Sequence, residues 1–154
     1  MAQQLVDELN FARREPVIYA TMISENYSGR YSKMDINETS SFLKYVTSCT
    51  NKLFLDNELS NAAIKWVEQQ GRTTSTGHGD FRRRMNVLNK TEIAENISYG
   101  HTNIRDIVVA WIIDEKIESK GHRNNIFNCN FENVGVGIGP HKSYRLMVDI
   151  ILST

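Results

Sequence analysis

Two successive runs of alternating apolar residues at the C-terminal end restrict the fold of this chain more than any other pattern in it. In the first run Val134, Val136 and Ile138 alternate with glycines, and over residues 144–152 every second residue is apolar. A period of two is typical of a β-strand. Residues 139–143, Gly-Pro-His-Lys-Ser, join the two runs, so the sequence predicts an antiparallel hairpin.

Upstream of the hairpin, apolar residues recur with the period of an α-helix. The clearest case starts at Leu59, where they fall at i, i+3, i+4, i+7 and i+8. Asp56 or Asn57 is predicted to cap this helix, and Gly71 to lie at or just beyond its end. The same reasoning predicts helices over about residues 3–14, 38–48 and 103–116, a loop over 24–37 and a short strand over 93–99.

The order of these elements indicates the fold class. Because helices come first and the hairpin last, the pattern favours an α+β layered fold over a parallel α/β fold. The chain has 154 residues, no internal repeat and no linker-like stretch. A single domain over residues 1–154 is therefore expected.

Charge and hydropathy exclude several classes of function. The chain carries 18 basic and 18 acidic residues, so it has no general attraction to nucleic acid. Its one basic run, Arg82-Arg83-Arg84, is interpreted as a solvated loop. No stretch reaches the roughly 20 apolar residues of a membrane-spanning helix, and residues 1–4 lack the features of a signal peptide. Either an intracellular protein or the product of signal cleavage fits this pattern.

The two cysteines, Cys49 and Cys129, lie far apart in the sequence. This spacing excludes a zinc ribbon and a thioredoxin motif. One disulfide and two buried thiols both remain compatible with it.

Three ionisable residues stand in unusual surroundings. His78 lies between two glycines in a polar loop, and His122 follows Gly121. Glu95 shares the apolar face of the strand predicted over 93–99. A carboxylate on such a face needs a partner, or its pKa must rise.

A fourth candidate is one of two neighbouring acids. On a helical wheel of residues 104–115, Glu115 falls near the middle of the apolar stripe and Asp114 at its edge. Either acid could join His78, Glu95 and His122 in one site. Imidazoles and carboxylates suit zinc or another divalent ion, which the histidines would ligate while the carboxylates orient the rings from behind.

Two other interpretations of these residues stay open. The four side chains could form a buried hydrogen-bonded network with a purely structural role. They could also serve a hydrolase, with His78 or His122 as general base and a metal-bound water or a nearby serine as nucleophile. Ser75 and Ser119 are the serines nearest in sequence to the two histidines.

Several ordered motifs resemble those of the cysteine-rich secretory, antigen 5 and pathogenesis-related 1 (CAP) family. Residues 121–127 and 131–137 are similar to the family's G-H-R-x-N-I…F…V-G-V-G signature, in its bacterial and protist form. Residues 94–97, A-E-N-I, resemble the G-E-N-I box. The segments 10–16 and 59–66 resemble the N-x-A-R…P and L-x-x-A-A-x-x-W-A helices.

The resemblance implies an α-β-α sandwich with a central cleft. His78, Glu95, an acid after Trp111 and His122 would line that cleft, and some members of the family bind zinc or another divalent ion through the histidines. The family's second Glu falls where this chain has Asp114, so Asp114 and Glu115 both stay candidates. The loop linked to sterol binding in related proteins has Phe81 as its one aromatic residue here.

The function that the resemblance implies is a secreted, non-enzymatic binding module. Its cleft would hold a divalent ion, a small apolar or lipid ligand, or a segment of a protein partner. A metal-dependent or Ser/His-type hydrolase, protease-like in character, is the alternative. Neither nucleic acid nor a membrane span is expected, and the oligomeric state is left open.

Overall fold

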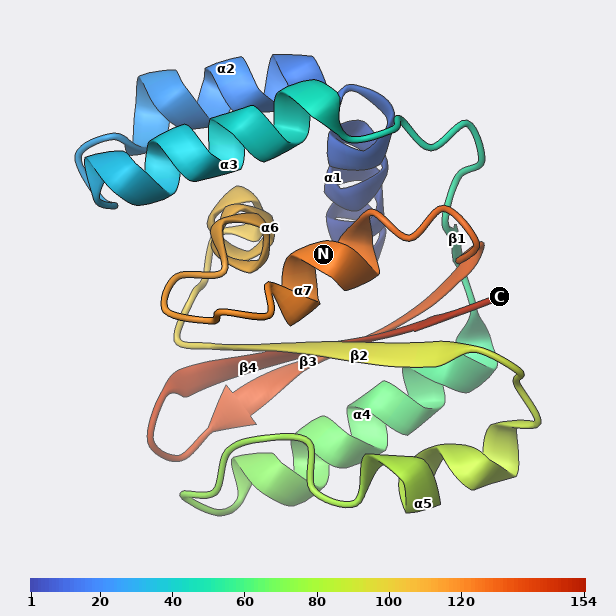
Figure 1. The fold of residues 1–154 in the computed structure, drawn as a ribbon. Helices are drawn as coiled ribbons and strands as arrows, with labels where there is room; N and C mark the ends of the chain where they lie inside the picture. Colours follow the sequence, from blue (N-terminus) through green and yellow to red (C-terminus); the bar gives the residue numbers. More distant parts are fainter.

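A computed structural model describes all residues 1–154 and shows a β-sheet between two layers of helices (Figure 1). The α+β sandwich expected from the sequence is therefore confirmed. One layer holds α1 (Ala2–Arg14), α2 (Pro16–Tyr27), α3 (Lys33–Tyr45), α6 (Ile104–Ile113) and α7 (Gly121–Ile126). The other holds α4 (Asn57–Gly71), α5 (Phe81–Met85) and the 3-10 helix η1 (Asn86–Leu88). None of these helices combines the length and the hydropathy that a membrane span requires.

The sheet has the strand order β1-β3-β4-β2. Its strands are β1 (Phe54–Leu55), β2 (Ile93–Tyr99), β3 (Asn133–His141) and β4 (Arg145–Ser153). β3 and β4 form the predicted antiparallel hairpin, but β3 continues through His141, so the turn is shorter than residues 139–143. β2 pairs with β4 and is an edge strand, which Figure 1 shows in front, between the two helical layers.

The N-terminal third is more helical than the sequence indicates. The loop predicted over 24–37 is wrong in extent, because α2 continues to Tyr27 and α3 begins at Lys33. Pro16 starts α2, at a position where its missing N–H has no helical partner to lose. Ser32 caps α3 by accepting a hydrogen bond from the backbone N–H of Asp35.

Two predicted helix starts are confirmed by their caps. The Asp56 side chain accepts from the N–H of Leu59 at the start of α4. At the start of α6, the Asn103 side chain accepts from two backbone N–H groups. This helix ends at Ile113, short of the predicted 116, because Asp114 takes a left-handed conformation with φ of 50°.

Apolar side chains fill both spaces between the layers. The larger core joins α1, α2, α3, α6 and α7 to one face of the sheet, through residues such as Val136, Val148 and Ile150. On the other face, two smaller clusters join α4, α5 and η1 to residues such as Ile97 and Ile151. The odd-numbered residues of β2 therefore face α4 and α5, and the even-numbered ones face α6 and α7.

Helix α4 lies directly on β3, and glycines make this contact possible. A Cβ atom added to Gly137 would lie 2.5 Å from the backbone carbon of Ala63 and 2.6 Å from its oxygen. A Cβ on Gly135 would collide with the backbone of Leu59. Because these contacts are with the backbone of a helix, no side-chain movement can relieve them.

The segments that follow α3 and α7 are joined by a disulfide between Cys49 and Cys129, whose sequence separation is 80. The alternative of two buried thiols is therefore wrong. Arg13 of α1 reinforces the same junction, because its guanidinium donates to the carbonyls of Ile126, Asn128 and Phe131.

The substitution Gly137→Ala is expected to destabilise the protein by about 3 kcal/mol, because it forces α4 away from the sheet. Gly29→Ala is the matched control, since a Cβ there meets nothing within 4 Å. Its expected effect is below about 0.5 kcal/mol. Urea denaturation of the two variants and the wild type measures both. Equal stabilities would contradict a backbone contact at Gly137.

Candidate functional site

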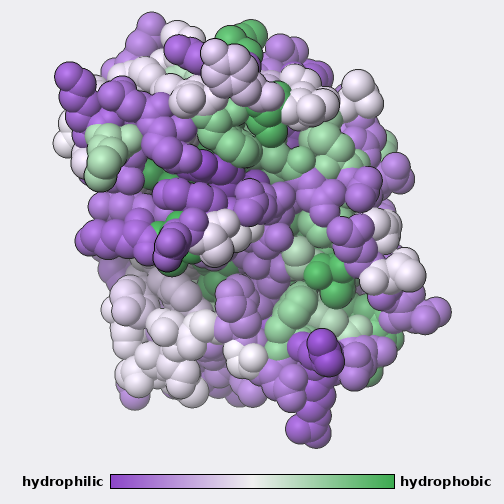
Figure 2. Space-filling view, viewed as in Figure 1, coloured by the Kyte–Doolittle hydropathy of each residue, from purple (hydrophilic) through white to green (hydrophobic).

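Two successive residues of the edge strand β2 carry the polar groups around which the candidate site is built. Glu95 faces α4 and α5, whereas Asn96 faces α6 and α7, and both are buried. Each holds one of the two histidines that the sequence singles out. On the face that includes β2, hydrophilic side chains predominate across the middle (Figure 2).

Below the sheet, Glu95 is bound by one cation and one imidazole. Its carboxylate accepts from Nη2 of Arg84 at 2.6 and 2.7 Å, and its Oε2 lies 2.6 Å from Nδ1 of His78. Only 1% of the Glu95 side chain is exposed, against 47% of the His78 side chain. The buried carboxylate thus has the partners that its position demands.

Arg84 is a site residue that sequence reasoning misses. The sequence groups it with Arg82 and Arg83 in a solvated run, but α5 turns it toward the sheet while the other two stay exposed. Its guanidinium stacks 4.2 Å from the centre of the Trp66 ring and also donates to the carbonyl of His78. The sequence feature that could have identified Arg84 is the buried position of Glu95, which requires a cation. Residues 82–84 are the nearest basic run before Glu95.

Above the sheet, His122 is held by Asp114. One oxygen of Asp114 accepts from the backbone N–H of His122 at 2.9 Å, and the other lies 2.7 Å from Nδ1 of its ring. Asn96 also donates to the carbonyl of His122. Glu115 is exposed and makes no hydrogen bond or ion pair with His122, so Asp114 is the acid that pairs with this histidine.

The left-handed turn at Asp114 explains why the helical wheel favours Glu115. The wheel extends the helix through residue 115, but α6 ends at Ile113. From its left-handed position the Asp114 side chain reaches the start of α7. Lys120 donates to the carbonyls of Ile113 and Asp114 and so stabilises the turn.

The candidate residues thus form two carboxylate–imidazole pairs on opposite sides of β2. No three His, Cys, Asp or Glu side chains gather into a group that could hold a metal ion. In both pairs Nδ1 contacts the carboxylate, which leaves Nε2 of each ring without a protein partner. A cavity of about 300 Å³ beside His122 is also lined by His101, Trp111 and Tyr99.

His141 and the two candidate serine nucleophiles have other contacts. His141 is buried and its Nε2 lies 2.8 Å from the carbonyl oxygen of Ser75. The carbonyl of Ser119 accepts from Asn124. Neither the Ser75 nor the Ser119 hydroxyl is hydrogen-bonded to an imidazole, so neither is activated as a nucleophile would be.

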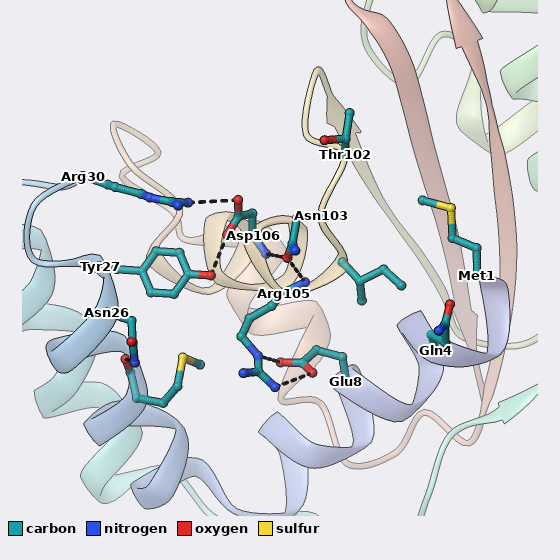
Figure 3. A pocket seen from close by; sticks show the side chains of 12 residues that line it. Met1, Gln4, Glu8, Asn26, Tyr27, Arg30, Thr102, Asn103, Arg105 and Asp106 are labelled. Atoms are coloured by element: carbon teal, nitrogen blue, oxygen red, sulfur yellow. Dashed lines mark hydrogen bonds and ion pairs between the residues drawn. The ribbon is translucent and has the colours of Figure 1, made fainter.

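A larger cavity, of about 830 Å³, lies between α1, α2 and the start of α6. Sequence reasoning does not point to it. Figure 3 shows that its charged groups face one another, with Glu8 bound to Arg105 and both Tyr27 and Arg30 bound to Asp106. The charged side chains of this cavity are therefore paired with one another. Neither candidate histidine lines it.

The substitution Asp114→Asn is expected to lower stability by about 1–3 kcal/mol, because the amide cannot accept from both the ring and the backbone of His122. Asparagine tolerates the left-handed conformation, so the loss reports on the carboxylate. Glu115→Gln is the neighbouring control and should change stability by less than about 0.5 kcal/mol. Urea denaturation distinguishes them, and a reversed order would contradict the assignment of Asp114.

Comparisons with known proteins agree on the fold. The model of the cysteine-rich secretory protein family, CAP, matches residues 47–150. An outer surface protein from Borrelia burgdorferi is 15% identical, with a TM-score of 0.57 over 80% of this chain and 95% of its own. A cysteine-rich secretory protein from Staphylococcus aureus is 14% identical, with a TM-score of 0.53 over 76% and 36%. Venom allergen-like protein 4 from Schistosoma mansoni is 13% identical, with a TM-score of 0.53 over 76% and 81%.

A curated relative matches over a shorter stretch. The uncharacterized protein YkwD from Bacillus subtilis is 38% identical over 58 residues. That match covers 38% of this chain and 20% of YkwD. The family match spans well over half of the chain, and the arrangement of the sheet and its helices agrees with it. The chain belongs to the CAP family.

Proposed function

We propose that this CAP domain is an extracellular binding module that holds a divalent metal ion through Nε2 of His78 and Nε2 of His122. The observation that carries the proposal is that a buried carboxylate contacts Nδ1 of each ring. A carboxylate in this position fixes the tautomer and orientation of a metal-binding histidine and makes its free nitrogen more basic.

The donor set suits an open, hydrated site. Two imidazoles are ligands that zinc and similar ions accept, and water would complete the coordination. The structure contains no third protein ligand of the kind that closes a structural zinc site. When bound, the ion would supply a positive centre for an anionic group of a ligand. Glu95 and Asp114 would keep both rings aimed, and Arg84 would keep Glu95 in place.

Two observations support an extracellular location. The Cys49–Cys129 disulfide is of the kind that persists in oxidising compartments. The similar structures include an outer surface protein and a protein described as a cysteine-rich secretory protein.

Binding fits the geometry better than hydrolysis. A hydrolase of the Ser/His type needs a hydroxyl within hydrogen-bond reach of its general base. The hydroxyls of Ser75 and Ser119 make no such contact. We therefore assign His78 and His122 to ligand binding.

Isothermal titration of the metal-stripped protein with zinc tests the proposal. One ion per chain is expected in the wild type, and no binding in the double variant His78→Ala, His122→Ala. Asp114→Asn should weaken binding by about 10-fold to 100-fold, because the His122 ring loses its orienting group.

His101→Ala is the control for this titration, since His101 lines the cavity beside His122 but has no carboxylate partner. It should bind zinc like the wild type. Loss of binding in this variant, or unchanged binding in the double variant, would contradict the proposed pair of ligands.

A further inference from the structure

Asp149 of β4 is a buried acid that none of the contacts described so far uses. It is 0% exposed, and neither of its carboxyl oxygens accepts a hydrogen bond from any donor. Ile97 is its register partner on β2, and Glu95 pairs with the next residue but one, Ile151. Asp149 and Glu95 are therefore diagonal neighbours on the same face of the sheet.

The surroundings of Asp149 cannot support a second negative charge. Its register partner on β3 is Gly137, which is backed by Ala63 of α4, so neither element offers a cation there. The one cation that faces this region is Arg84, and its guanidinium is already bound by the Glu95 carboxylate. An ionised Asp149 would be desolvated and would lie beside a like charge.

The other titratable groups on this side are neutral or already paired. The Tyr99 hydroxyl donates to Gln70 and accepts from the N–H of Gly77, and His78 contacts Glu95. Burial, first, and then the negative charge of Glu95 hold the pKa of Asp149 well above its usual range, although Arg84 acts in the opposite direction. The neutral acid is the form that this site favours.

Glu95 has room for one more donor. A carboxylate offers about four acceptor positions. Arg84 occupies one position on Oε1 and one on Oε2, and His78 occupies a second position on Oε2. The free position is on Oε1, the oxygen that His78 does not contact.

We propose that Asp149 is protonated in the folded protein at neutral pH and donates its hydrogen bond to Glu95, so that it acts as a positioning residue for the His78 side of the site. With Arg84 and Asp149 both bound to Glu95, the carboxylate cannot rotate, and Oε2 stays aimed at Nδ1 of His78. The ligand role of His78 rests on the proposed function, but the protonation of Asp149 does not.

Carbon-13 NMR of carboxyl-labelled aspartate tests the protonation directly. The resonance of Asp149 is assigned by its loss in Asp149→Asn. It should keep the chemical shift of a protonated acid at neutral pH, and in Glu95→Gln it should titrate at lower pH than in the wild type. Titration near the ordinary aspartate pKa of about 3.9 would overturn the proposal.

Stability as a function of pH gives a second test. Above about pH 4 the unfolded chain releases the Asp149 proton while the folded protein keeps it, so this group destabilises the fold increasingly as pH rises. The Asp149→Asn variant has no titratable group at this position, so its stability does not include this effect. The ratio of wild-type to variant unfolding constants should therefore rise by roughly tenfold per pH unit, until Asp149 ionises in the folded state. A ratio that does not change with pH would show that Asp149 is charged when folded.

The positioning role is read from nitrogen-15 shifts of the His78 ring in protein without metal. Asp149→Asn keeps a donor toward Glu95 and should preserve the wild-type shifts, whereas Asp149→Leu removes the donor and should change them. Identical shifts in all three proteins would overturn the positioning role. Because no metal is added, failure of the zinc titration leaves this result unaffected.

Discussion

The geometry of the site depends on the need to satisfy two buried polar residues in succession on an edge strand. Because side chains alternate along β2, Glu95 and Asn96 point into different layers, and each layer must supply partners. Below the sheet this requirement brings in Arg84 and His78. Above the sheet it fixes the carbonyl of His122. The loop that carries His78 and the start of α7, which carries His122, are thereby placed on either side of the same strand.

Where local patterns determine structure, the sequence is sufficient. The period of two predicts β2, β3 and β4, and the apolar stripe with its Asp56 cap predicts α4. The same reasoning places Glu95 on a buried face and requires a partner for it. It cannot name Arg84, because three consecutive arginines look alike until a short helix turns one of them inward.

The other errors also arise where a local pattern ends. Polar residues between 24 and 37 suggest a loop, yet most of them lie on the outer faces of α2 and α3. Polar side chains are compatible with these helices because they face solvent there. A helical wheel cannot show that Asp114 leaves the helix, since a left-handed residue is stabilised by contacts that form only in the folded protein. Asp149 could not be identified from the sequence either, because the alternating pattern of β4 does not show that Glu95 lies beside it on β2.

The two sides of the site differ in how firmly they hold their histidines. Asp114 binds both the ring and the backbone of His122, and 27% of that side chain is exposed. His78 is bound to Glu95 through its ring alone, in a loop where Gly77 and Gly79 both have positive φ, and 47% of it is exposed. Rotation of either ring breaks one contact with a carboxylate, but the His78 ring is more exposed, so its rotation is less hindered by neighbouring atoms. A ligand that binds both rings would find His122 already in position and would have to order His78. How readily His78 is ordered would then depend on how firmly Arg84 and Asp149 hold Glu95.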